Sequence, residues 1–146
     1  MAAESSFTHM LFFIAAIVVA VSVAGVLIGV SNSMANEIRL KSDNLASEMG
    51  TDITIINDPR QVPYSNGTLT LYIKNTGDIT LNYNGIGIFI DGQYLDGSVI
   101  TSEEGSPYWQ PTKTLELQVT VALEPGDHMV KVVMPNGVSD TMAFRI

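Results

Sequence analysis

The stretch that decides the architecture is Met10–Val30, which reads MLFFIAAIVVAVSVAGVLIGV. It holds 18 apolar residues among 21, one hydroxyl group at Ser22 and no charge. At about 1.5 Å per helical residue it covers about 30 Å, the thickness of a bilayer core. A secretory signal peptide would instead place a basic segment before a shorter apolar run, and residues 1–9 contain no lysine or arginine. We therefore expect a retained helix that crosses a membrane or packs in the core of a filament.

The same helix is expected to continue beyond the apolar stretch, because residues 31–49 contain neither proline nor glycine. Four apolar side chains recur there on one helical face: Met34, Ile38, Leu45 and Met49. Gly50 then supplies a helix stop. The pattern predicts one helix from Ser5 to Met49, with an exposed apolar stripe that favours a packing partner.

Small residues form stripes along this helix, and such stripes let two helix backbones approach closely inside a membrane. The predicted helix-packing interface comprises Glu4, Ala16, Ala20, Ser22, Ala24, Gly25, Gly29 and Ser33. Glycine and alanine are also common in membrane helices that do not pair, so both interpretations stay open. For Glu4 we favour the simpler interpretation, an acid near a helix N-terminus that interacts with the helix dipole. Basic residues flank the apolar stretch too sparsely to decide its orientation in a membrane.

After Gly50 the period of the apolar residues changes from 3.6 to 2, which indicates strands. Six segments are expected to be strands: Asp52–Asn57, Thr68–Lys74, Gly85–Asp91, Thr114–Leu123, His128–Met134 and Val138–Arg145. Turn pairs such as Asn66-Gly67 and Asp91-Gly92 separate them. We predict an α+β chain in two parts: a transmembrane, pilin-like helix and stalk over residues 1–49, and an all-β immunoglobulin-like sandwich over residues 50–146.

Charge and chemistry exclude several classes of protein. The formal net charge is −8, and residues 51–146 carry 11 acidic and five basic residues, so a nucleic-acid-binding surface is not expected. The chain has no cysteine and only two histidines, His9 and His128. The run Asp91–Gly97 resembles a calcium loop, but tight turns explain its two Asp-Gly pairs better. We expect no catalytic residues, no metal site and no cofactor, and hence not an enzyme.

Two loop features are candidates for contact or modification. Tyr108 and Trp109 lie between two prolines, where they could anchor a partner or fold back over the end of the sandwich; we favour the second. Asn66-Gly67-Thr68 matches the acceptor pattern for N-glycosylation. Because Asn-Gly is also a common hairpin turn, this pattern is only a weak indication of an extracytoplasmic domain.

The order of these features resembles the archaeal flagellar protein G (FlaG/ArlG) family, membrane-anchored components of the archaellum motor. The resemblance rests on the apolar helix and on three short segments: Thr51–Pro59, Tyr72–Gly77 and Phe89–Gly92. It implies a single-pass protein of the cell membrane whose β-sandwich lies outside the cytoplasm, in the periplasm-like space beneath the surface layer. It also implies a stator that works with archaeal flagellar protein F, links membrane and envelope, and can self-assemble into filaments.

Two alternatives come from other classes of protein. One is a filament subunit of an archaellin or archaeal type IV pilin-like polymer, in which the apolar helices form the core. The other is a membrane-anchored binding module, which would have a ligand pocket where a stator would have a sheet edge or an aromatic patch bound to protein.

Overall fold

The structure is a computed structural model of the chain. It describes the backbone of residues 2–95, 99–101 and 106–146, and the side chains of residues 6–95 and 106–146. The chain divides into two compact units, Met1–Asp43 and Asn44–Ile146. The first unit is helical, and the second contains the last turns of the helix together with all the strands.

Helix α1 (Ala2–Gly50) is a single uninterrupted α-helix. It begins three residues before the predicted Ser5 and ends one residue after Met49. Within the first unit every described side chain is exposed, and the helix is long and apolar enough to cross a membrane. The hydroxyl group of Ser22 donates a hydrogen bond to the carbonyl of Val18 at 2.7 Å. The one hydroxyl in the apolar stretch is thus satisfied inside the helix, as a lipid environment requires.

The end of α1 is held by residues of the second unit. Both the backbone N–H and the hydroxyl group of Thr51 donate to the carbonyl of Ser47, at 3.1 and 2.7 Å. The side-chain amide of Asn136 donates in turn to the Thr51 hydroxyl at 2.7 Å. These bonds attach the last turn of α1 to the loop before β11.

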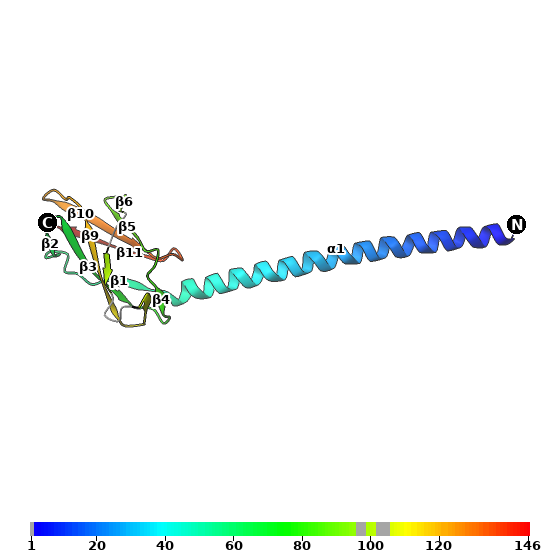
Figure 1. Cartoon of the computed structure of the whole chain (residues 1–146), viewed down its shortest axis with the longest axis horizontal. Helices are drawn as coiled ribbons and strands as arrows, with labels where there is room; N and C mark the ends of the chain where they lie inside the picture. The colour runs from blue at the N-terminus through cyan, green and yellow to red at the C-terminus, as the bar shows by residue number, and fades with distance from the viewer. Residues whose placement is uncertain (1, 96–98, 102–105) are drawn as a thin grey trace. The chain divides into compact units, whose positions relative to one another are not determined.

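The strands of the second unit form two main antiparallel sheets (Figure 1). The first sheet has the order β1-β3-β9-β7, with β2 also paired to β3. Its strands are β1 (Ile53–Ile55), β2 (Tyr64–Ser65), β3 (Thr68–Asn75), β7 (Val99–Thr101) and β9 (Thr114–Thr120). The second sheet has the order β11-β10-β5-β6. Its strands are β5 (Gly87–Ile90), β6 (Gln93–Leu95), β10 (Asp127–Val133) and β11 (Ser139–Arg145). A small ribbon pairs β4 (Leu81–Asn82) with β8 (Tyr108–Trp109).

The core lies between the two main sheets and is built from the alternating apolar residues of the longer strands. The first sheet supplies fully buried residues from β3 and β9: Leu69, Leu71, Ile73, Leu115, Leu117 and Val119. The second sheet supplies inward-facing residues from β5, β10 and β11: Ile88, Ile90, Val130, Val132, Met142 and Phe144. The predicted β-sandwich after a long apolar helix is therefore confirmed.

All six predicted strands are present, although Gly85–Asp91 shortens to β5 and Thr114–Leu123 ends at Thr120. Five further strands, β2, β4, β6, β7 and β8, were not predicted. Each has only two or three residues, which is too short for a period of two to be visible in the sequence.

The edges of the two sheets are joined through one carboxylate. Asp140 in β11 accepts hydrogen bonds from the backbone N–H of Ile55 in β1 and from that of Thr141, both at 2.8 Å. Farther along β11, the N–H of Arg145 donates to the carbonyl of Pro59 at 3.2 Å. Two backbone donors of β11 and one of β1 are therefore already occupied within the domain.

Candidate functional site

The predicted helix-packing residues lie in the exposed first unit. Ala16, Ala20, Ser22, Ala24 and Ser33 are exposed, and a Cβ atom added at Gly25 or Gly29 would meet nothing within 4 Å. The side chain of Glu4 lies outside the described residues. The helix surface is therefore open to a partner helix, and its use as an interface stays a prediction.

Tyr108 and Trp109 separate onto opposite sides of β8, because successive residues of a strand point in opposite directions. Trp109 is buried and its indole Nε1 donates to the carbonyl of Lys113 at 2.8 Å. Tyr108 is 60% exposed. Trp109 thus folds into the core, as favoured above, and only Tyr108 is available for contact with a partner.

Asn66 lies at the tip of the hairpin between β2 and β3. Asn66 and Gly67 both have positive φ, 50° and 74°, which is the conformation of a tight two-residue hairpin turn. The Asn66 side chain is exposed. The site is sterically accessible to a glycan, and its glycosylation stays a prediction.

Among the described residues, no group of three or more His, Asp or Glu side chains could hold a metal ion. In the run Asp91–Gly97, Asp91 and Gly92 form the turn between β5 and β6, with φ of 51° and 81°. Residues 96–98 lie outside the described residues.

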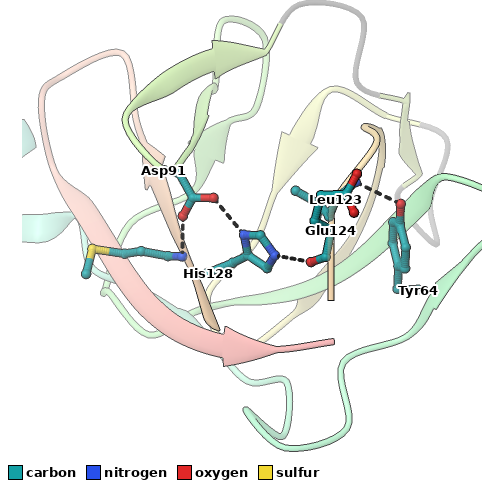
Figure 2. A network of polar contacts seen from close by, with 6 residues as sticks. Tyr64, Asp91, Leu123, Glu124 and His128 are labelled. Atoms are coloured by element: carbon teal, nitrogen blue, oxygen red, sulfur yellow. Dashed lines mark hydrogen bonds and ion pairs between the residues drawn. The ribbon is translucent and has the colours of Figure 1, made fainter. Parts of the chain in front are cut away.

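A network of polar contacts surrounds His128, at the start of β10 (Figure 2). Its Nδ1 lies 2.7 Å from Asp91 Oδ2, and its Nε2 lies 2.8 Å from the carbonyl oxygen of Glu124. The other carboxylate oxygen of Asp91 accepts the N–H of Met129 at 2.8 Å. The ring also packs against Phe144, with centroids 5.6 Å apart. His128 therefore ties the β5–β6 turn to the loop before β10.

The two partners of the ring favour its charged form. A carbonyl and a carboxylate both accept, so a ring that donates to each from its two nitrogens is an imidazolium. The hydrogen bond to Asp91 raises the pKa of His128 above 6.5, and the same bond lowers the pKa of Asp91 below 3.8. With both nitrogens engaged, this pair stabilises a turn and does not present a free base.

The Glu124 loop is fixed from its other side by a tyrosine. The hydroxyl group of Tyr64 accepts the N–H of Leu123 at 3.0 Å and donates to the carbonyl of Val121 at 3.1 Å. Figure 2 shows Tyr64 and His128 on either side of the Leu123–Glu124 segment. A cavity of about 260 Å³ lies beside this loop, lined in part by Gln93, Leu95 and His128.

The outer surface of the second sheet carries an apolar groove. We call the β10 face the group Phe89, Tyr94, Met129, Lys131 and Val133. Met129 and Tyr94 are 54% and 59% exposed, and the rings of Phe89 and Tyr94 lie 5.5 Å apart. The groove has a volume of about 350 Å³ and is lined by four of these residues, Phe89, Met129, Lys131 and Val133, together with Gly92 and Thr141. Contiguous exposed apolar side chains of this kind mark interaction surfaces.

The sequence itself contains a signal for this face. In the run His128–Met134, apolar residues occupy both alternating positions, so one set must point away from the core. The two-residue turn at Asp91-Gly92 also pairs Phe89 with Tyr94, which places two aromatic rings on one face.

The sequence model of the archaeal-type flagellin family matches residues 3–144. The chain belongs to this family. Two relatives are named putative flagella-related protein G. That of Methanocaldococcus jannaschii is 32% identical over 143 residues, with 94% of this chain and 92% of the relative covered. That of Methanococcus voltae is 27% identical over 154 residues, with 99% of each chain covered.

Solved structures of this fold come from Sulfolobus acidocaldarius. Its archaellum periplasmic stator protein FlaG matches with a TM-score of 0.53 and 18% identity, covering 64% of this chain and 99% of that one. A complex of FlaF and FlaG from the same organism matches with a TM-score of 0.48, 18% identity, and coverages of 61% and 90%. The predicted resemblance to the flagellar protein G family is confirmed, and the names of the relatives do not favour the filament-subunit alternative.

Proposed function

We propose that this chain is a membrane-anchored stator component of the archaellum motor, which links the cell membrane to the envelope and self-assembles there. Its partners are a protein of the flagellar protein F kind and the surface layer, as the family resemblance implies. The function is structural, and catalysis is not part of it.

One observation carries this proposal: a single chain joins an uninterrupted apolar helix to a sandwich that has an apolar outer face. The helix provides an anchor of membrane length within α1 (Ala2–Gly50). The β10 face provides a surface for protein contact.

The topology we propose places the sandwich outside the cytoplasm. The solved FlaG is named a periplasmic stator protein, and we assign the same side to residues 44–146 here. Because the chain has no cysteine, single-cysteine variants report topology directly. A maleimide that cannot cross membranes should label Gln110→Cys in intact cells and should label Ser6→Cys only after lysis. The reverse pattern would refute the orientation.

Cell fractionation separates a stator from a filament subunit. Filaments are sheared from cells, and this chain is then quantified by mass spectrometry in the sheared filaments and in the washed membranes. A stator stays in the membranes and, after solubilisation in mild detergent, co-purifies with the protein of the flagellar protein F kind. Recovery in the sheared filaments in amounts like those of the major subunit would overturn the proposal.

A further inference from the structure

A second groove of the sandwich combines apolar side chains with uncharged polar ones. It has a volume of about 320 Å³ and shares no lining residue with the β10 face. Four of its lining residues are apolar: Ile79, Leu81, Met134 and Pro135. The others carry hydroxyl or amide groups, and none of the described residues that line the groove is charged.

Three asparagines line this groove, although they come from distant parts of the sequence. Asn82 and Asn84 belong to β4 and to the turn after it, and Asn136 belongs to the turn between β10 and β11. They are three of the five exposed asparagines of the second unit. The fold therefore gathers amide groups at one concave place on the surface of the domain.

The backbone that carries these amides is fixed by hydrogen bonds. Asn82 Oδ1 accepts the backbone N–H of Asn84 at 2.9 Å. The side chain of Asn136 donates to the hydroxyl group of Thr51 at 2.7 Å, and its Oδ1 accepts the N–H of Val138 at 3.3 Å. Because both turns are ordered before a ligand arrives, binding does not have to supply the entropic cost of ordering them.

Some of the amide groups are left unused by the fold. Asn82 Nδ2 and the side-chain amide of Asn84 have no hydrogen-bond partner among the described residues. An amide presents N–H donors next to an acceptor oxygen, and neighbouring hydroxyl groups of a sugar ring both donate and accept. The apolar lining residues provide a surface for the C–H groups of such a ring. A phosphate, carboxylate or amine would find no opposite charge among the described residues of this groove.

We propose that this groove binds a neutral saccharide of the cell envelope, with the amides of Asn82 and Asn84 bonded to its hydroxyl groups. This inference rests on the envelope link in the proposed function and names the chemistry of that contact. A peptide strand fits the groove less well. Because β4 has only two residues, its edge presents too few backbone groups for strand addition.

A single groove should bind its saccharide weakly. Each hydrogen bond to the ligand replaces hydrogen bonds to water, so we expect a Kd on the order of 1 mM. When an envelope repeats the same saccharide and several copies of the chain share one membrane, simultaneous binding raises the overall strength. The contact would therefore hold only where both sides present many sites.

Treatment of the envelope with periodate tests the class of ligand. Periodate cleaves the carbon–carbon bond between neighbouring hydroxyl groups and so destroys sugar rings. The full chain in lipid nanodiscs is passed over immobilised envelope fragments that are free of membrane, and surface plasmon resonance measures binding. We expect binding to fall at least about tenfold after periodate. The neutral glycans released from the same envelope should compete with the untreated fragments.

An asparagine variant tests the groove itself. Asn84→Ala should weaken binding to untreated fragments by about tenfold. Asn44→Ala is the matched control, since it removes an exposed asparagine that does not line the groove. The melting temperature of both variants, followed by Trp109 fluorescence, should stay unchanged because both side chains are exposed.

The possible outcomes separate this site from the proposed function. Binding that survives periodate, no competition by the released glycans, or equal binding by the two variants would overturn the saccharide site. Each of these results would leave the link to the envelope standing as a contact made elsewhere on the chain. If the unchanged chain does not bind even the untreated fragments, the envelope link is overturned together with the saccharide site.

Discussion

The carboxylate of Asp91 and the imidazole of His128 lie 2.7 Å apart, although 37 residues separate them in the chain. This contact holds the turn between β5 and β6 against β10, next to the groove of the β10 face. The neighbouring charged groups are Asp127, which also favours the charged imidazole, and Arg145, which pairs with Asp127 at 3.6 Å. A turn that borders the proposed interaction surface therefore depends on a protonation state.

The stability of the domain should change with pH through this pair. The pKa of His128 is raised from 6.5 on folding, so its stabilisation is complete below 6.5 and is lost as the pH rises through the higher folded value. The pKa of Asp91 is lowered from 3.8, so its stabilisation is complete above 3.8 and is lost as the pH falls. The melting temperature should therefore fall both on acidification below this window and on alkalinisation above it.

The single tryptophan, the buried Trp109, reports this unfolding by fluorescence in the full chain in detergent. His128→Gln should remove most of the fall in melting temperature that occurs on alkalinisation. Asp91→Asn is a second test variant with the same expected effect, because its amide oxygen can still accept from Met129 while the charge that raises the pKa of His128 is gone. If the melting temperature of both variants still falls with rising pH as it does in the unchanged chain, the assignment to this pair is contradicted.

Asp140→Ala should destabilise the sandwich by about 1–3 kcal/mol, because it leaves the N–H of the buried Ile55 without an acceptor. Chemical unfolding followed by Trp109 fluorescence measures this difference. Ser139→Ala, at the exposed neighbouring position, is the control and should change stability by less than about 0.5 kcal/mol. Equal effects of the two substitutions would show that the link between β1 and β11 is not stabilising.

Gly77→Ala should destabilise the domain by more than about 2 kcal/mol through a backbone clash. A Cβ atom at Gly77 would collide with the carbonyl of Gly50 and lie 2.5 Å from the backbone nitrogen of Asp52. Gly126→Ala is the control, since a Cβ there meets nothing within 4 Å. Thermal unfolding of the two variants compares them, and a mild effect at Gly77 would mean that the end of α1 can move away from this loop.

Tyr108 and Trp109 should behave differently when each is shortened to alanine. Trp109→Ala should cost about 3–5 kcal/mol of stability because it empties a buried site. Tyr108→Ala should change stability by less than about 0.5 kcal/mol, so any loss of partner binding in that variant reports a direct contact. Unfolding curves and co-purification of the partner measure the two effects. Strong destabilisation by Tyr108→Ala would remove its role as a contact residue.

Gly25→Leu combined with Gly29→Leu should weaken association of the helices in lipid without changing the melting temperature of the sandwich. The added side chains would fill the space that close backbone approach requires. Val19→Leu with Val26→Leu is the control, since both positions lie outside the predicted stripe. Cross-linked oligomers that persist equally in both double variants would refute the packing interface.

The long elements were predictable because each repeats one physical signal many times. In Met10–Val30 the apolar signal continues over several helical turns, and in Thr68–Lys74 apolar and polar residues alternate along the whole strand. The contact between Asp91 and His128 was not predictable, because it depends on the register between β5 and β10. The burial of Trp109 instead of Tyr108 was not predictable either. It depends on the pairing of Trp109 in β8 with Leu81 in β4, and each of these strands has only two residues.

The hydrogen bonds made by Asp140 and Pro59 have a consequence for copies of the domain that are held close together. An open sheet edge accepts a strand from any neighbour and so fuses crowded domains irreversibly. Here the donors of Ile55, Thr141 and Arg145 are already taken within the domain. The edges of β1 and β11 are therefore closed to strand addition at these positions, so copies of the domain held close together would not fuse through them.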